Sequence, residues 1–91
     1  MPCIKYALEG EDRDLYVKVE DLLGPLGAPA LDDLAEMIYL LDEYTDARTI
    51  AELAGAYARI TGLVGEEGAP LLSDLAATVI LLALTDEEVY A

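Results

Sequence analysis

The sequence lacks several residue types on which most enzyme active sites depend. It contains no His, Asn, Gln, Trp or Phe, and it has one serine and one cysteine, Ser73 and Cys3. Without histidine, the usual combinations of nucleophile, base and orienting residue cannot be assembled, and the common zinc ligand sets are missing. One cysteine cannot form an internal disulfide. We therefore expect a non-enzymatic protein with no cofactor and no metal site.

Basic residues are also scarce. Five Lys and Arg stand against nineteen Asp and Glu, which gives a net charge of −14. Direct binding of nucleic acid needs a cluster of bases to neutralise phosphates, and the negative charge also repels anionic membranes. The N-terminus lacks the basic stretch and apolar run of a signal peptide. These absences predict a cytoplasmic protein that binds neither nucleic acid nor membrane directly and is attracted to basic protein surfaces.

Residues 70–84 form the longest apolar stretch. From Leu75 to Leu84 only Thr78 interrupts the apolar residues, which cover every side of a helix. A helix that is apolar all round is either buried or crosses a membrane. Crossing needs about 20 such residues, and this stretch is shorter than that. We predict that 70–84 is the central core helix. The alternative is an interface helix whose burial is completed by another subunit of a homo-oligomer.

The N-terminal residues alternate between apolar and polar on both sides of a turn near Gly10–Arg13. This alternation predicts a β-hairpin over residues 1–19. Its apolar face would carry Ile4, Tyr6, Leu8, Leu15, Val17 and Val19. Its polar face would carry Lys5, Glu9, Tyr16 and Lys18. Like charges would face each other across the strands, which opposes the hairpin. A helix over residues 12–23 is the alternative, since its apolar residues also share one helical face.

Residues 20–91 are predicted to be helical. A glycine- and proline-rich segment at 24–27 precedes a helix over 30–45, and Thr45-Asp46 can end that helix and cap the next. A third helix runs to Val64 and is broken by glycines before residues 70–84. We therefore expect a single domain, residues 1–91, that is mainly α: a small bundle of three to four helices with an N-terminal β-hairpin (α+β).

An internal repeat with an offset of 41 residues is the most specific pattern in the sequence. Aligning residues 16–41 with residues 57–82 gives twelve identities in 26 positions. The shared unit, G-x-x-G-A-P-x-L-x-D-L-A, begins at Gly24 and at Gly65. It describes a glycine break, a helix started by proline and an acid in the first turn, where the helix dipole favours it. Because two copies are too few for a helical array, we interpret the repeat as a pseudo-symmetric pair of core helices.

Acidic residues without local partners gather on the predicted helix 30–45. Residues 20–46 contain eight Asp and Glu and no Lys or Arg. Like charges one turn apart cost about a few tenths of a kcal/mol per pair, so helix stability does not favour this arrangement. The group is either an ordinary solvated face or a binding surface. This acidic strip consists of Asp32, Glu36, Tyr39, Asp42, Glu43 and Asp46.

Charge and composition together indicate a non-enzymatic interaction protein. We expect an inhibitor or adaptor whose acidic strip occupies a basic, nucleic-acid-binding surface on its partner protein. In size and charge the chain resembles small acidic proteins encoded by phages, including DNA mimics and some anti-CRISPR proteins, although it shares no motif with them. The alternative function is that of a structural homo-oligomer subunit that associates through residues 70–84.

Overall fold

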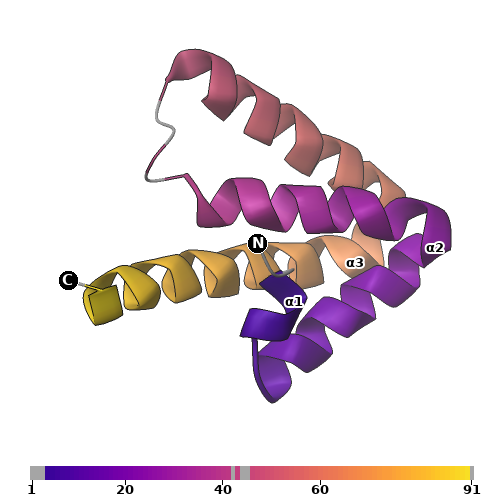
Figure 1. The fold of residues 1–91 in the computed structure, drawn as a ribbon. Helices are drawn as coiled ribbons and strands as arrows, with labels where there is room; N and C mark the ends of the chain where they lie inside the picture. Colours follow the sequence, from indigo (N-terminus) through magenta and orange to yellow (C-terminus); the bar gives the residue numbers. More distant parts are fainter. Residues whose placement is uncertain (1–3, 42, 44–45, 91) are drawn as a thin grey trace.

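The computed structural model describes residues 4–41, 43 and 46–90, with side chains as far as Thr85. Its described helices are α1 (Ile4–Ala7), α2 (Glu11–Tyr39) and α3 (Ala47–Tyr90) (Figure 1). Non-helical backbone at Gly24 divides α2 into arm A (11–23) and arm B (25–39), and at Gly65 it divides α3 into arm C (47–64) and arm D (66–90). The bundle therefore consists of two helical hairpins, and the short helix α1 packs against the first of them.

The predicted N-terminal β-hairpin is wrong, because both of its proposed strands are helical and no strand occurs in the described ranges. Tyr16, which the hairpin placed on its polar face, is fully buried together with Val19. A separation of three residues puts two side chains on one face of a helix but on opposite faces of a strand. Three acidic residues also occupy the first turn of α2, where the helix dipole favours them. The alternative helix over residues 12–23 is therefore the structure observed.

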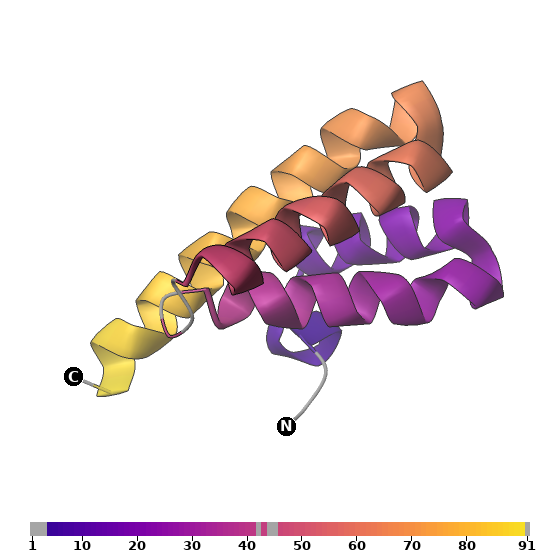
Figure 2. The same cartoon turned by 90° about the horizontal axis from the view of Figure 1, so that it is seen from above.

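The 41-residue repeat corresponds to the two hairpins. Gly24 has φ 75° and ψ 177°, and Gly65 has φ 74° and ψ −173°. Residues other than glycine hardly ever adopt this conformation, so the first glycine of each repeat unit is what permits the reversal of the chain. Figures 1 and 2 show both reversals at the same end of the molecule. The repeat is thus a pair of helical hairpins rather than a pair of single core helices.

The second glycine of each unit allows the two arms of a hairpin to approach closely. A Cβ atom on Gly27 would lie 3.0 Å from Cβ of Leu23, and one on Gly68 would lie 2.5 Å from Cβ of Val64. The Gly68 position is also 3.0 Å from Cδ1 of Leu22. Near its tip each hairpin therefore has its two arms in close contact, and the tips of the two hairpins also contact each other.

The core lies mainly along arms B and D. The repeat pairs Leu31 with Leu72, Leu34 with Leu75, and Ile38 with Val79, and all six side chains are buried. Arm D is buried on one side only, since Ile80, Leu81 and Leu84 are between 43% and 64% exposed. The prediction of a core helix at 70–84 thus describes one side of arm D, and its other side reaches the surface.

The helix boundaries differ from those expected at three places. Arm B begins at Pro25, so Pro29 lies inside it, and α2 ends at Tyr39 rather than near residue 45. In α3 only Gly65 leaves the helical conformation, whereas Gly62 and Gly68 stay within it. A helix tolerates an isolated glycine at a modest cost, which explains why the other glycines do not end the arms.

Candidate interaction surfaces

Two members of the acidic strip are engaged within the chain. Asp32, which is half-buried, accepts a hydrogen bond from the hydroxyl of Tyr16 in arm A. Asp46 precedes α3 and accepts hydrogen bonds from the Thr49 backbone nitrogen at 3.1 Å and from Thr49 Oγ1 at 2.8 Å. The hydrogen bonds from the Thr49 side chain and backbone lower the pKa of Asp46 below its usual value. Asp46 is therefore a helix cap, as the sequence predicted.

The other strip residues do not form one continuous helical surface. Glu36 on arm B and Glu43 beyond its end are exposed, and Tyr39 is half-buried against the core. Asp42 lies outside the described residues. Because α2 ends at Tyr39, the regular helical spacing assumed for the strip stops there. The structure brings Glu36 close to Asp33 instead, at a depression of about 420 Å³ that is also lined by Met37, Leu40 and Thr49.

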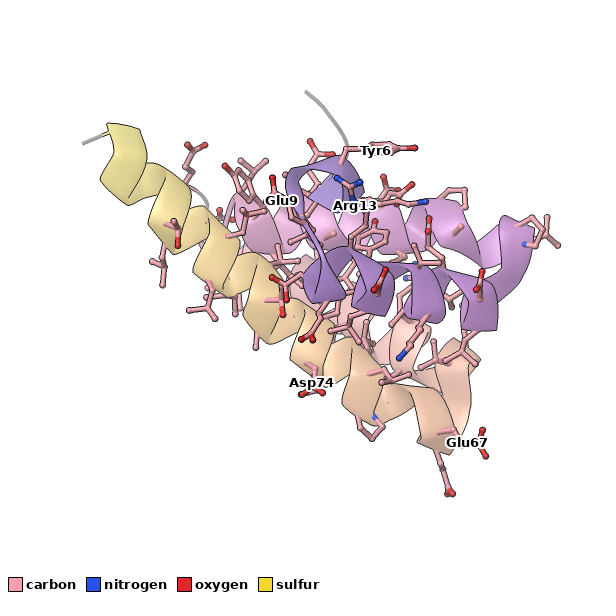
Figure 3. The ribbon with its side chains drawn as sticks, turned by 90° about the horizontal axis from the view of Figure 1, so that it is seen from below. Tyr6, Glu9, Arg13, Glu67 and Asp74 are labelled. Atoms are coloured by element: carbon pink, nitrogen blue, oxygen red, sulfur yellow. The ribbon has the colours of Figure 1, made fainter. Side chains whose placement is uncertain are left out.

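Two of the five basic side chains are held near the N-terminus. Arg13 donates from Nε to the Leu8 carbonyl at 3.0 Å and from Nη2 to the Tyr6 carbonyl at 3.2 Å, so it caps the end of α1 (Figure 3). Lys5 Nζ lies 2.9 Å from a carboxylate oxygen of Glu20, and this contact raises the pKa of Lys5. These contacts tie α1 to arm A.

The remaining bases lie in exposed positions. Arg48 is 3.5 Å from Glu52 on arm C, and both side chains are largely exposed, so this ion pair adds little to stability. Lys18 and Arg59 are exposed as well. Figure 3 shows Glu67 and Asp74 projecting outward from arm D. No group of three or more Asp, Glu, Cys or His is placed to hold a metal ion among the residues with described positions.

An open apolar groove runs between arms C and D, with the end of arm B at its base. It has a volume of about 380 Å³, and none of its lining side chains is charged. It continues into a smaller hollow of about 60 Å³ beside Tyr39, Ala83 and Leu84. The residues that line the apolar groove are Ile38, Leu41, Ile50, Leu53, Ala54, Tyr57, Ala76 and Ile80.

The sequence gives no signal for this groove. The apolar residues of arm C recur at helical spacing, and such a face is normally covered by the core. In the structure Ile60 and Val64 are buried near the tip, whereas Ile50, at the other end of arm C, is 46% exposed. The spacing is the same in both parts, so only the three-dimensional arrangement of the arms distinguishes a covered face from an open one.

Helix α3 is also long and apolar enough, over Ala47–Thr85, to cross a membrane by length and composition. This criterion is weak, because core helices of soluble proteins satisfy it too. The kink at Gly65 divides the segment into arms C and D, which run back along each other (Figure 1). Only 28% of its most apolar window is buried, which agrees with the open side of arm D and the apolar groove.

Comparison with known proteins adds no relative from which a function could be transferred. The charge and packing of the chain itself are therefore the basis for what it binds. No family model matches the sequence, and neither a curated protein nor a solved structure is similar to it.

Proposed function

We propose that this chain is a non-catalytic binding protein, an inhibitor or adaptor, whose partner presents a basic surface. The observation that carries the proposal is a negative charge that the molecule cannot neutralise itself. Even if all five bases were paired with different acids, the net charge of −14 would be left unpaired. Such a field attracts basic partners and accelerates their association.

Exposed carboxylates on and beyond arm B are the surface we assign to this contact. Asp33, Glu36 and Glu43 are exposed, and Asp33 and Glu36 flank a depression with an apolar floor at Met37 and Leu40. Carboxylates of this kind can pair with Lys or Arg, while the apolar floor supplies contact area. Asp32 and Asp46, with their hydrogen bonds inside the chain, contribute mainly to the field.

The proposal can be tested by capture from a lysate of the source cells. The immobilised chain should retain basic proteins, identified by mass spectrometry, which elute as the NaCl concentration rises because salt screens the contact. The variant Glu36→Lys with Glu43→Lys should bind the captured partner at least about tenfold more weakly, since close charge pairs can be worth several kcal/mol.

The matched control is Glu66→Lys with Glu67→Lys, which makes the same charge change at exposed positions on the tip of the second hairpin. If the control variant retains the partner, the carboxylates of arm B are the contact. Equal weakening in both variants would show that only the total charge matters. Binding that ignores both salt and charge reversal would refute the proposal.

A homo-oligomer is the second candidate, favoured by the exposed side of arm D at Ile80, Leu81 and Leu84. Two copies of a chain with a net charge of −14 repel each other, so self-association should strengthen when salt screens that repulsion. Binding to a basic partner should weaken under the same conditions. Sedimentation at low and high salt therefore separates the two functions by the sign of the salt effect.

A further inference from the structure

The two hairpins are similar in sequence, but a short helix packs against only the first of them among the described residues. Helix α1 covers part of that hairpin's groove, and a hollow of about 310 Å³, lined in part by Leu8, Glu9 and Asp12, remains beside it. In the first hairpin, α1 packs against α2, and its Ile4 and the following Leu8 are 4% and 2% exposed. The equivalent region of the second hairpin, 41 residues later, is the open apolar groove. No described segment of the chain plays the part of α1 there, since Ala47 and Arg48, the equivalents of Tyr6 and Ala7, form the first turn of α3.

The side chains at equivalent positions of the two grooves explain the difference. In arm A, Arg13 donates to the Tyr6 and Leu8 carbonyls and so holds α1 in place. Its equivalent in arm C is Ala54, which lines the apolar groove. Glu9 and Asp12 of the first hairpin likewise correspond to Ile50 and Leu53. The second groove thus has Ala54 in place of Arg13, whose hydrogen bonds hold α1, and it has apolar residues in place of two exposed acidic ones.

We propose that the apolar groove is a docking site for an amphipathic helix that carries Lys and Arg on its polar side and belongs to the partner protein. This inference rests on the proposed function and adds the shape and apolar character of the partner's contact. A helix laid in an apolar groove by residues at i, i+3 or i+4, and i+7 is a common recognition mode. In the first hairpin, a one-turn helix and the residue that follows it bury two apolar side chains four positions apart, Ile4 and Leu8.

Charge decides between the candidate occupants. Glu43, which lies between the lining residues Leu41 and Ile50 in sequence, is exposed. Bases on the polar side of a docked helix would be attracted by this carboxylate and by the net charge of −14. A second copy of this chain brings the same negative charge to the contact, so it is the less favourable occupant.

The test uses three synthetic peptides of about four helical turns. The first has Leu on one face and Lys on the other, the second has Leu and Glu, and the third has Ala and Lys. We expect the Leu/Lys peptide to bind the intact chain at least about tenfold more tightly than either control, because it alone combines apolar anchors with positive charge. Methyl NMR shifts should change most at Ile50, Ile80 and Leu41.

Variants show whether the contact is in the apolar groove. Ile50→Ser with Ile80→Ser alters two lining residues that are 46% and 43% exposed, and Leu22→Ser with Leu63→Ser is the matched control at the hairpin tips, where the residues are 45% and 58% exposed. The groove variant should bind the Leu/Lys peptide at least about tenfold more weakly, and the tip variant should bind it like the wild type. Circular dichroism confirms that both variants are folded.

Three results would overturn the groove proposal. Equal binding of the Leu/Lys and Ala/Lys peptides would mean that charge alone attracts them. Unchanged binding by the groove variant would place the contact elsewhere. A wild-type dimer that only the groove variant converts to a monomer would make a second copy the occupant. Each of these could occur while salt-sensitive capture of basic proteins persists, so failure of the groove proposal is distinguishable from failure of the proposed function.

Discussion

At the scale of single residues, equivalent positions of the repeat agree in burial more often than in residue type. Val19 and Ile60 differ, as do Ile38 and Val79, yet both members of each pair are buried. Tyr16 is an exception, because it is fully buried and hydrogen-bonded to Asp32, whereas its equivalent Tyr57 is half-buried at the apolar groove. The two hairpins thus share their core residues and differ where α1 covers only the first.

Leu75 lies at the centre of this shared core, with 2% of its surface exposed. Leu75→Ala should lower the free energy of unfolding by about 2–5 kcal/mol, because it removes buried methyl groups and leaves a cavity. Leu81→Ala is the control on the same arm, where the side chain is 64% exposed, and it should change stability by less than about 1 kcal/mol. Urea denaturation of both variants gives the comparison, and similar losses in the two would contradict the assigned core.

At the scale of elements, the helical hairpin is the repeating unit, and its reversal depends on one glycine. Gly65→Ala should destabilise the protein by about 1–3 kcal/mol, because alanine is strained in this backbone conformation. Gly62→Ala, three residues earlier in the helical part of arm C, meets no atom within 4 Å and should stabilise it by about 0.5–1 kcal/mol. Thermal unfolding measures both, and a loss of stability in Gly62→Ala would show that arm C is not helical there.

The repeat unit was predictable from the sequence because glycines and prolines mark a reversal wherever it occurs. That each repeat unit belongs to a helical hairpin was not predictable, because this depends on whether residues 12–23 form a helix. The apolar residues there fit both an alternating strand and a helix. The ion pair between Lys5 and Glu20 accompanies the helical arrangement, but it joins residues 15 positions apart and cannot be read from the local pattern. The local sequence pattern could therefore locate the two chain reversals, but it could not determine whether the segment before the first reversal is a helix or a strand.

At the scale of the whole molecule, charge opposes the packing. The net charge of −14 acts on 91 residues, and self-repulsion of this kind destabilises a compact state. The unfolding temperature should therefore rise by several degrees between about 10 mM and about 300 mM NaCl, as the Debye length shortens. The Glu36→Lys, Glu43→Lys variant carries less net charge and should show a smaller rise. A salt-independent unfolding temperature would mean that repulsion is negligible.

The acidic surface could be anticipated only in part. Its total charge follows directly from composition, and Glu36 and Glu43 are exposed as expected. The cap at Asp46 follows from the local sequence, because Thr49 lies three residues on. The hydrogen bond of Asp32 does not, because Tyr16 lies on another arm. The apolar groove could not be predicted for a related reason. A sequence shows which residues are apolar, but it does not show which of them the fold leaves exposed.

The uneven burial of arm C has a consequence for motion. Residues 47–58, the first two thirds of arm C, contain no fully buried side chain. Little apolar surface is therefore exposed when this part of the arm separates from the bundle. Regions of this kind open locally at a fraction of the global unfolding free energy. Backbone amides of residues 47–58 should therefore exchange with solvent far faster than those of residues 72–79. A docked helix would have to restrict this opening, and the lost conformational entropy would reduce its affinity.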